Sequence, residues 1–213
     1  MNEEEAKAWL ASRFSVPRET SAKLDQYVSL LIAGMASQNL ISESTRPHVW
    51  ARHIVDSAQL IPIAAPASPG EWIDLGSGAG LPGIVIAVLS GFSVTMIEAR
   101  RKRVEFLQHV IGALELSNAQ VFAGRVEAAT CGKADVISAR AYAPLPKLFE
   151  SAHHLSTDKT RWFLPKGRNA ENELEVVRPS WQGVFHVERS VTDADSAIIV
   201  AEAVQSKGKR GRR

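Results

Sequence analysis

The segment spanning residues 74–83, DLGSGAGLPG, constrains the fold more than any other part of this chain. It follows a short apolar run, 72–75, that is typical of a strand, and it leads into the apolar stretch 82–89, which has helical character. Alternating glycines let the backbone turn tightly and let a ligand come close to main-chain atoms. A plain strand-to-helix turn needs fewer glycines, so the segment predicts a ligand-binding loop at the N-terminus of a helix.

Beyond residue 71, strand-like runs alternate with helical stripes. Helices are expected over 82–89 and 104–114. This alternation predicts an α/β fold with a mostly parallel sheet that is covered on both faces, closed by an antiparallel pair formed by the last two strands. The seven expected strands span residues 72–75, 92–98, 119–123, 134–139, 160–164, 183–189 and 196–204.

The first 65 residues have a different, helical pattern. Apolar residues recur at helical spacing between Leu24 and Met35, after a start signal at 17–20. A second helix is expected over Pro47–Ile61, with Pro47 in its first turn. Three prolines and a glycine then mark a linker over 62–70. We expect residues 1–65 to form a helical cap that belongs to the same globule as the sheet.

The identity of the ligand depends on two carboxylates, Asp74 and Glu98. Residues 78–83 also satisfy the dinucleotide pattern G-x-G-x-x-G, so NAD is one candidate. Glu98 ends the second strand, where a carboxylate can accept hydrogen bonds from ribose hydroxyls of NAD or of S-adenosylmethionine alike. Asp74 favours S-adenosylmethionine, because a carboxylate beside the loop suits a cationic sulfonium and repels a pyrophosphate. Asp74 could instead only bond the loop N–H groups.

Charge and cysteine content bear on partners and location. Residues 207–213 hold five basic side chains, Lys209 and Arg210 among them, so the net charge of +2 leaves −3 for the rest. Such a tail suits a phosphate backbone, or is simply a solvated end. The single Cys131 allows no internal disulfide, and no apolar run approaches the roughly 18 residues of a membrane span. A cytoplasmic protein without membrane contact is expected.

Several further stretches between residues 24 and 203 carry a family resemblance. They are Asn39-Leu40, RHIVDS at 52–57, KRVEFL at 102–107, GRVE at 124–127, SARA at 138–141 and Lys166-Gly167. Together with segment 74–83, and in the same order, they resemble the bacterial glucose-inhibited division protein B family, the guanine-N7 methyltransferases of 16S ribosomal RNA. Ile41-Ser42 departs from the Asn-Leu-Thr segment of that family.

The resemblance implies a fold and an activity. The fold is the Rossmann-like α/β fold of class I S-adenosylmethionine-dependent methyltransferases, with a mostly parallel seven-stranded sheet and an N-terminal helical extension. The implied enzyme transfers a methyl group from S-adenosylmethionine to N7 of a guanine, at position 527 of 16S ribosomal RNA. The methyltransferase domain then spans residues 66–206, after the cap at 1–65 and before a disordered basic tail at 207–213.

The loop pattern and the resemblance together predict a cofactor site. Glu98 would bind the ribose, Val126 and Glu127 would contact the adenine, and Arg140 would reach the ligand from the end of the fourth strand. Arg140 is also the single candidate for a catalytic role, and no metal ligands are expected. The full set of expected cofactor residues is Asp74, Gly76, Gly78, Gly80, Leu81, Glu98, Val126, Glu127 and Arg140.

Missing motifs narrow the chemistry. Methylation of an exocyclic amine usually uses an Asp/Asn-Pro-Pro-aromatic motif, but residues 140–144 read RAYAP. Methylation of a ring carbon needs a cysteine nucleophile, and Cys131 is expected to be a small buried residue. Guanine N7 has an in-plane lone pair and no proton to lose, so it needs no base. The sequence therefore permits N7 methylation without requiring it.

Candidate RNA contacts lie in both halves of the chain. Arg52, His53 and Asp56 share a helix face, where they would hold RNA or dock the cap onto the sheet. Docking is favoured for His53 and Asp56, and phosphate contact for Arg52. Tyr142 is a candidate for stacking on a base and Lys166 for contact with a phosphate or a carboxylate. Lys209 and Arg210 complete the set. The expected partner is 16S ribosomal RNA or the small ribosomal subunit, bound by a monomer.

Two other functions stay open from the residues alone. One is an NAD-dependent oxidoreductase of small molecules, for which no substrate dyad is visible. The other is a nucleotide-binding module without catalysis that the basic tail tethers to RNA.

Overall fold

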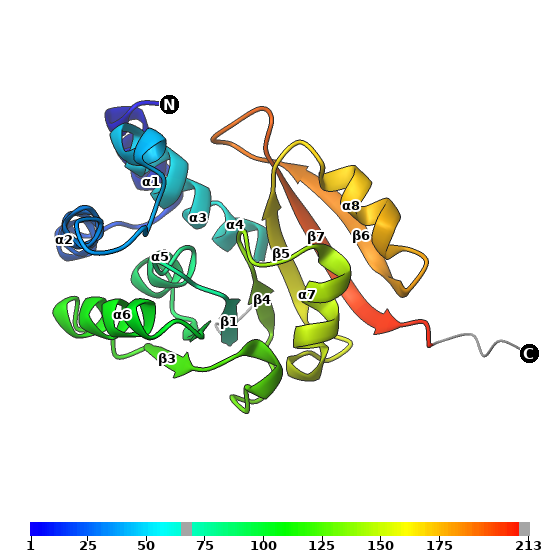
Figure 1. The fold of residues 1–213 in the computed structure, drawn as a ribbon. Helices are drawn as coiled ribbons and strands as arrows, with labels where there is room; N and C mark the ends of the chain where they lie inside the picture. The colour runs from blue at the N-terminus through cyan, green and yellow to red at the C-terminus, as the bar shows by residue number, and fades with distance from the viewer. Residues whose placement is uncertain (65–69, 209–213) are drawn as a thin grey trace, which may run out of the picture.

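A seven-stranded sheet forms the centre of the molecule, whose computed structural model describes residues 1–64 and 70–208 (Figure 1). The strand order is β3-β2-β1-β4-β5-β7-β6. The first five strands run parallel, whereas β7 pairs antiparallel with both β5 and β6. The predicted mostly parallel sheet and its closing antiparallel pair are confirmed. The strands are β1 Glu71–Leu75, β2 Ser93–Glu98, β3 Ala119–Ala123, β4 Val136–Ser138, β5 Arg161–Lys166, β6 Trp181–Arg189 and β7 Ala197–Ser206.

The central strands are apolar throughout because both of their faces are buried. Successive side chains of a strand point to opposite faces. Trp72 and Met96 therefore belong to one hydrophobic cluster, and Ile73 and Ile97 belong to the other. This explains why β1 and β2 appear in the sequence as continuous apolar runs rather than as alternating ones.

Helices cover both faces of the sheet. Helices α5 Gly83–Leu89 and α6 Arg101–Ala113 pack on the face of Trp72, and α7 Leu145–Ala152 and α8 Ala170–Val177 pack on the face of Ile73. Helices α7 and α8 were not among the helices expected from the sequence. No helix within residues 1–64 and 70–208 is long and apolar enough to cross a membrane.

The N-terminal region is helical as expected, but the single helix predicted over Pro47–Ile61 is wrong. Pro47 lies inside a 3₁₀ turn, and the N–H of Asp56 bonds the carbonyl of Ala51 five residues back, which widens the next turn into a π-helix. Such π turns occur frequently at functional sites. The N-terminal elements are α1 Glu3–Arg13, α2 Arg18–Gly34, η1 Glu43–His48, η2 Trp50–Val55, α3 Asp56–Ala58 and α4 Leu60–Ala64.

These N-terminal elements share a hydrophobic core with the sheet. Leu24, Leu31 and Ile54 belong to the same cluster as Ile84 of α5. The hydroxyl of Tyr27, fully buried, donates to the carbonyl of Ala79 across 2.9 Å. The N-terminal region therefore packs directly on the glycine-rich loop and helps to hold it in place.

Cys131 differs from its prediction. It is half-buried rather than buried, at the edge of the cluster that contains Ile73. The segment 130–134 around it forms no helix or strand, so part of the side chain stays in contact with solvent.

Candidate active site

Two cavities lie at the carboxyl ends of the parallel strands and share one wall. The smaller, about 500 Å³ in volume, lies over the ends of β1, β2 and β3. The larger, about 810 Å³, lies between the end of β5, the N-terminal region and the loop that joins β6 to β7. Residues 141–143, which follow β4, line both. Ligands of open α/β sheets bind at this edge, so the two cavities form the candidate active site.

The glycine-rich loop between β1 and α5 is a compact turn held by its own backbone. Ser77 donates its N–H to the carbonyl of Ile97 on β2, and Gly80 donates to the carbonyl of Ser77. Gly76, Gly78 and Gly80 have φ angles of 61°, 58° and 91°, which side chains other than glycine rarely adopt. The alternating glycines are thus required by the backbone path of the loop.

Glu98 connects this loop to the next strand and faces the smaller cavity. Its Oε2 accepts a hydrogen bond from the N–H of Gly78 at 2.9 Å, and its Oε1 accepts one from the N–H of Arg100 at 2.8 Å. The guanidinium of Arg103 lies 3.9 Å from Oε2. A carboxylate can accept about four hydrogen bonds, so two positions remain for a ligand.

Asp74 lies behind the glycine-rich loop, fully buried. Its Oδ2 accepts from the N–H of Gly83 at 3.2 Å, and its Oδ1 accepts from the hydroxyl of Ser138 at 2.8 Å. Burial is the main reason why its pKa is raised to about 6. The bond to Gly83 matches the alternative role, in which the side chain bonds the loop itself, and direct contact of Asp74 with a ligand stays a prediction.

Three other predicted cofactor residues of the loop, Gly78, Gly80 and Leu81, pack against neighbouring side chains, and their contact with a ligand stays a prediction. Leu81 is buried in the hydrophobic core beside Ala79. A Cβ atom on Gly80 would lie 2.5 Å from Ile84, and one on Gly78 would lie 3.3 Å from Arg103. These positions shape the loop by packing, whereas Gly76 lines the smaller cavity.

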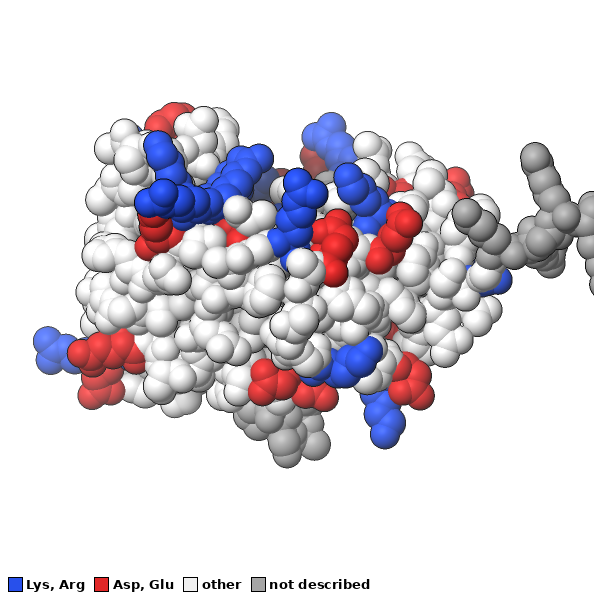
Figure 2. Space-filling model, turned by 60° about the horizontal axis from the view of Figure 1, so that its bottom comes forward, with Lys and Arg blue, Asp and Glu red and all other residues white. Residues whose placement is uncertain are grey.

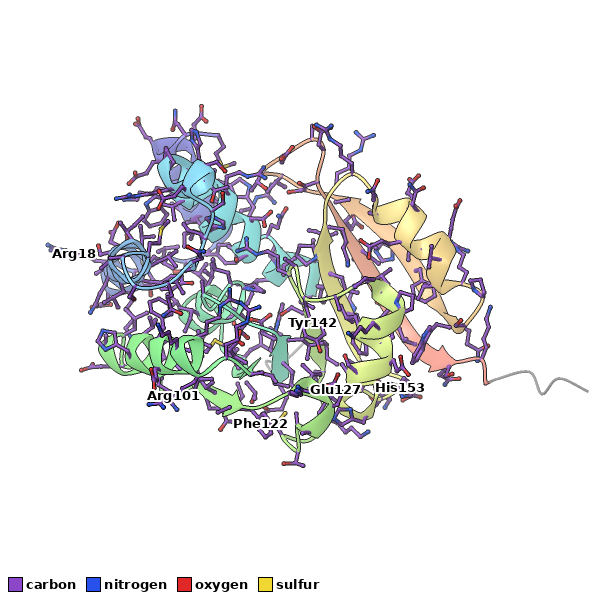
Figure 3. All side chains as sticks on the ribbon, viewed as in Figure 1. Arg18, Arg101, Phe122, Glu127, Tyr142 and His153 are labelled. Atoms are coloured by element: carbon purple, nitrogen blue, oxygen red, sulfur yellow. The ribbon has the colours of Figure 1, made fainter. Side chains whose placement is uncertain are left out.

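Val126 and Glu127 begin a short 3₁₀ turn, η3 Val126–Ala128, directly after β3, and both line the smaller cavity. The side chain of Val126 is buried in the core, so its backbone is the part that can meet a ligand. Glu127 is exposed, and Figure 3 shows it near Tyr142 and beside α7. The turn therefore forms part of the wall of the smaller cavity at the end of β3.

Tyr142 forms the wall between the two cavities. Its ring packs on Gly76, where a Cβ atom would lie 2.5 Å from Cδ2 of the ring. Its hydroxyl lies 3.3 Å from the hydroxyl of Ser151 on α7, and burial raises the pKa of the phenol. The flat ring of Tyr142 thus separates the smaller cavity from the larger one, and ligands in the two cavities would lie on either side of it.

Arg140 lies in the wall of the larger cavity rather than the smaller one. Its Nη1 donates to the carbonyl of Arg52 and lies 3.4 Å from a carboxylate oxygen of Asp56, while its Nη2 lies 3.1 Å from Nδ1 of His53. Its side chain thus turns toward the N-terminal elements, and the predicted contact of Arg140 with the cofactor stays a prediction. His53 and Asp56 have the docking role that the sequence analysis favoured.

His53 is a neutral residue in this cluster. Burial, together with the charges of Arg140 and Arg52, lowers its pKa to about 3. Its Nε2 lies 2.8 Å from the hydroxyl of Thr45, which in turn donates to the carbonyl of Ser42. The cluster therefore extends from the end of β4 to the segment before η1.

Arg52 and Lys166, the other predicted RNA contacts, each pair with a carboxylate. Arg52 pairs with Asp193 in the loop between β6 and β7. Lys166 lies 2.8 Å from Glu173 of α8 and donates to the carbonyl of Ala143. In Figure 2, basic side chains gathered along the upper edge likewise have acidic neighbours. Lys209 and Arg210 lie outside the described residues.

The structure adds residues that sequence reasoning missed. Arg125 and Lys147 line the smaller cavity, and Arg125 belongs to the quoted GRVE stretch, which was the available signal for it. Arg103 of α6 also lies in the cavity wall. Among residues 1–64 and 70–208, no group of three His, Cys, Asp or Glu side chains is placed to hold a metal ion.

Comparisons with known sequences place this geometry in a family. The sequence model of GidB, described as rRNA small subunit methyltransferase G, matches residues 20–198. A ribosomal RNA small subunit methyltransferase G from Rhizorhabdus wittichii is 50% identical over 217 residues, covering 100% of this chain and 99% of that protein. One from Sphingopyxis alaskensis is 46% identical, covering 99% and 91%.

Solved structures that resemble this chain have the same fold at low identity. A mutant of MtNAS in complex with S-adenosylmethionine superposes with a TM-score of 0.62 at 16% identity, covering 95% of this chain and 84% of that one. A putative S-adenosylmethionine-dependent methyltransferase from Methanococcus maripaludis has a TM-score of 0.57 at 15% identity, covering 75% and 89%. The fold is that of the class I methyltransferases, as predicted.

Proposed function

The chain belongs to the rRNA small subunit methyltransferase G family, and on that premise we propose that its two cavities bring a methyl donor and a guanine base together. It is an enzyme that uses S-adenosylmethionine to methylate RNA of the small ribosomal subunit. The finer proposal is that the acceptor atom is N7 of a guanine in 16S ribosomal RNA. The observation that supports methyl transfer between the two cavities is their shared wall at residues 141–143, because the transfer requires both reactants to meet at one point.

The smaller cavity suits S-adenosylmethionine in size and in its donor set. Its volume of about 500 Å³ is within the range of small-molecule sites. Glu98 has two free acceptor positions for the ribose hydroxyls, and the turn at Val126 and Glu127 offers backbone groups to the adenine. Gly76 leaves room where a Cβ atom would meet Tyr142. When bound, S-adenosylmethionine supplies an electrophilic methyl group on a sulfonium.

The larger cavity suits the RNA side of the reaction. Its walls carry Arg52, Arg140 and Lys166, and Tyr142 offers an aromatic ring on which an unstacked base can lie. Guanine N7 has no proton to lose, so no side chain has to act as a base. The residues of this chain contribute by holding the base in line and excluding water, and alignment alone can contribute about 7–11 kcal/mol to such a step.

The strand order supports the methyltransferase over an NAD-dependent oxidoreductase. Dinucleotide-binding folds have the order 3-2-1-4-5-6 with all strands parallel. Here the antiparallel β7 lies between β5 and β6. The two adjoining cavities likewise support catalysis over the non-catalytic module.

Organisation and surroundings follow the same proposal. Residues 1–65 act as a cap that belongs to the same globule as the methyltransferase domain at 66–206, in keeping with their shared core. The chain acts as a monomer in the cytoplasm, on 16S ribosomal RNA or the small subunit that contains it.

Two measurements test the proposed function. Calorimetric titration with S-adenosylhomocysteine and, separately, with NADH should show micromolar binding of the first alone. The enzyme should then transfer a labelled methyl group to small subunits that lack the modification, and borohydride and aniline treatment should cleave the RNA at the resulting 7-methylguanosine. Binding of NADH, or label at another atom of the RNA, would contradict the proposal.

A further inference from the structure

The loop that joins β6 to β7, residues 190–196, lies along the larger cavity and is anchored at its base. Gln59 accepts a hydrogen bond from the N–H of Val191 at 2.9 Å, and the hydroxyl of Thr192 donates to Asp56 at 2.9 Å. Ser190 and Ser196 at the two ends of the loop line the cavity. The position of this loop is therefore set by hydrogen bonds to the amide of Gln59 and the carboxylate of Asp56, both in the N-terminal elements.

The tip of the same loop carries two carboxylates, and each pairs with an arginine from a different element. Asp193 pairs with Arg52 of η2, and Asp195 pairs with Arg168, which follows β5. The N–H of Asp195 also donates to Asp193, which together with Arg52 lowers the pKa of the Asp193 carboxyl. Two negative charges two residues apart thus hold two arginines at the rim of the cavity.

Exposure separates these two ion pairs from the others around the cavity. The side chains of Arg52 and Arg168 are 40% and 77% exposed, whereas that of Lys166 is 13% exposed. Arg140, at 21%, is also held by His53 and by the carbonyl of Arg52. Exposed ion pairs are weak and exchange partners readily. Arg52 and Arg168 are therefore the cations that a phosphate can most easily capture.

On the basis of the proposed function, we propose that Arg52 and Arg168 bind phosphates of the RNA strand that enters the larger cavity, and that these phosphates replace the carboxylates of Asp193 and Asp195. Arg168 lies between Gly167 and Asn169, which line that cavity, so an RNA strand on the rim passes within its reach. Guanidinium groups bind phosphate and carboxylate with the same fork of N–H donors, which makes the exchange chemically direct.

The exchange has a consequence for selectivity. In the free protein the two carboxylates orient the arginines and neutralise them, which weakens attraction to polyanions in general. An RNA whose shape also fills the cavity gains enough contact to displace both. The acidic tip therefore acts as an internal competitor of phosphate, and its removal strengthens RNA binding at the expense of discrimination.

The test compares charge variants by their binding to unmodified small ribosomal subunits and to a single-stranded polyuridine RNA over a series of salt concentrations. Asp193→Asn/Asp195→Asn removes the competing charges and keeps the side-chain oxygen that accepts from the N–H of residue 195. Glu71→Gln/Asp158→Asn is the matched control. Glu71 begins β1 and Asp158 precedes β5, so both lie at the amino ends of the strands, opposite the cavities. Arg52→Gln/Arg168→Gln removes the cations.

The aspartate variant should bind polyuridine about tenfold more tightly than the wild type, and the control should change little. The arginine variant should bind more weakly, with a salt dependence reduced by about one unit of slope for each arginine. Combining the arginine and aspartate substitutions should abolish the gain, because carboxylates can compete with phosphate only where arginines are present. The single variant Asp195→Asn, on the more exposed of the two pairs, should show part of the gain even if the double variant folds poorly.

An aspartate gain equal to that of the control, or one that persists without the arginines, would overturn this assignment. Methyl transfer to small subunits by the wild type is measured in parallel. If the wild type methylates the subunits but the aspartate and arginine substitutions act independently on RNA binding, the phosphate exchange fails while the proposed function stands. If the wild type transfers no methyl group, the proposed function itself fails.

Discussion

The guanidinium of Arg140 donates to Nδ1 of His53 across 3.1 Å, and this contact decides which nitrogen of the imidazole carries the proton. Arginine can only donate, so Nδ1 must accept. Nε2 is then the protonated nitrogen, and it donates to the hydroxyl of Thr45 at 2.8 Å. The end of β4 is thereby linked through a neutral imidazole to Thr45 of η1, and His53 serves as a positioning residue for Arg140.

A first prediction concerns His53 and acid. Its pKa is lowered from 6.5 in a free side chain to about 3, mainly by burial. The stability that the neutral imidazole provides is therefore complete above pH 6.5 and is lost as the pH falls toward 3. At pH 5 the loss is about 2 kcal/mol. Urea unfolding at pH 8 and pH 5 should show that His53→Gln lacks this part of the wild-type pH response, and an unchanged response would contradict the assignment.

Asp74 should respond to pH with the opposite sign. Burial raises its pKa from 3.8 to about 6, so its contribution is most favourable below pH 3.8 and is lost as the pH rises through 6. Ionisation of this carboxyl then costs about 2–3 kcal/mol at neutral pH. Asp74→Asn removes the titration, although it weakens the bonds to Gly83 and Ser138. The variant should be less stable overall, but its stability should depend less on pH between 4 and 7; a parallel pH curve would exclude this role.

A third prediction concerns the contact between Gly76 and Tyr142. Gly76→Ala places a Cβ atom 2.5 Å from the ring and forces an L side chain to a φ of 61°. We expect a loss of about 1–3 kcal/mol in unfolding free energy and loss of S-adenosylhomocysteine binding. Gly132→Ala is the matched control, because Gly132 also has a positive φ, at 88°, but open space around it. Adding Tyr142→Ala should restore part of the stability of Gly76→Ala and none of that of the control; equal effects in both would refute a steric contact.

Glu98 provides a fourth prediction. Glu98→Gln places an amide N–H₂ group against the N–H of either Gly78 or Arg100, because each carboxylate oxygen already accepts one of them. The affinity for S-adenosylhomocysteine should fall about tenfold or more, which corresponds to the loss of one or two hydrogen bonds to a charged group. Calorimetry would measure it. The control Glu105→Gln, on the exposed face of α6, should bind as the wild type does, and a Glu98 variant that also did so would contradict a ribose role.

Much of the sheet could be predicted because each strand is recognisable from consecutive residues of the sequence. Apolar runs between turn residues identify all seven strands, and the glycine-rich loop is recognisable from consecutive residues. Helices α7 and α8 were not predicted, although Leu145, Leu148 and Ala152 of α7 recur at helical spacing, which was the available signal for that helix. The 47–61 region was predicted as one helix because periodicity does not distinguish a π turn from an α turn over so short a stretch.

What the sequence by itself determined is the parallel α/β fold, the glycine-rich loop with Glu98 at the end of the next strand, and the family. These depend on the spacing of residues that are near each other in the chain. Only the tertiary structure decided that Asp74 lies behind the loop, that Arg140 turns toward His53, and that Arg52 pairs with Asp193, 141 residues away. The direction and partner of a charged side chain depend on which distant elements pack beside it. The spacing of residues along the chain does not indicate these contacts.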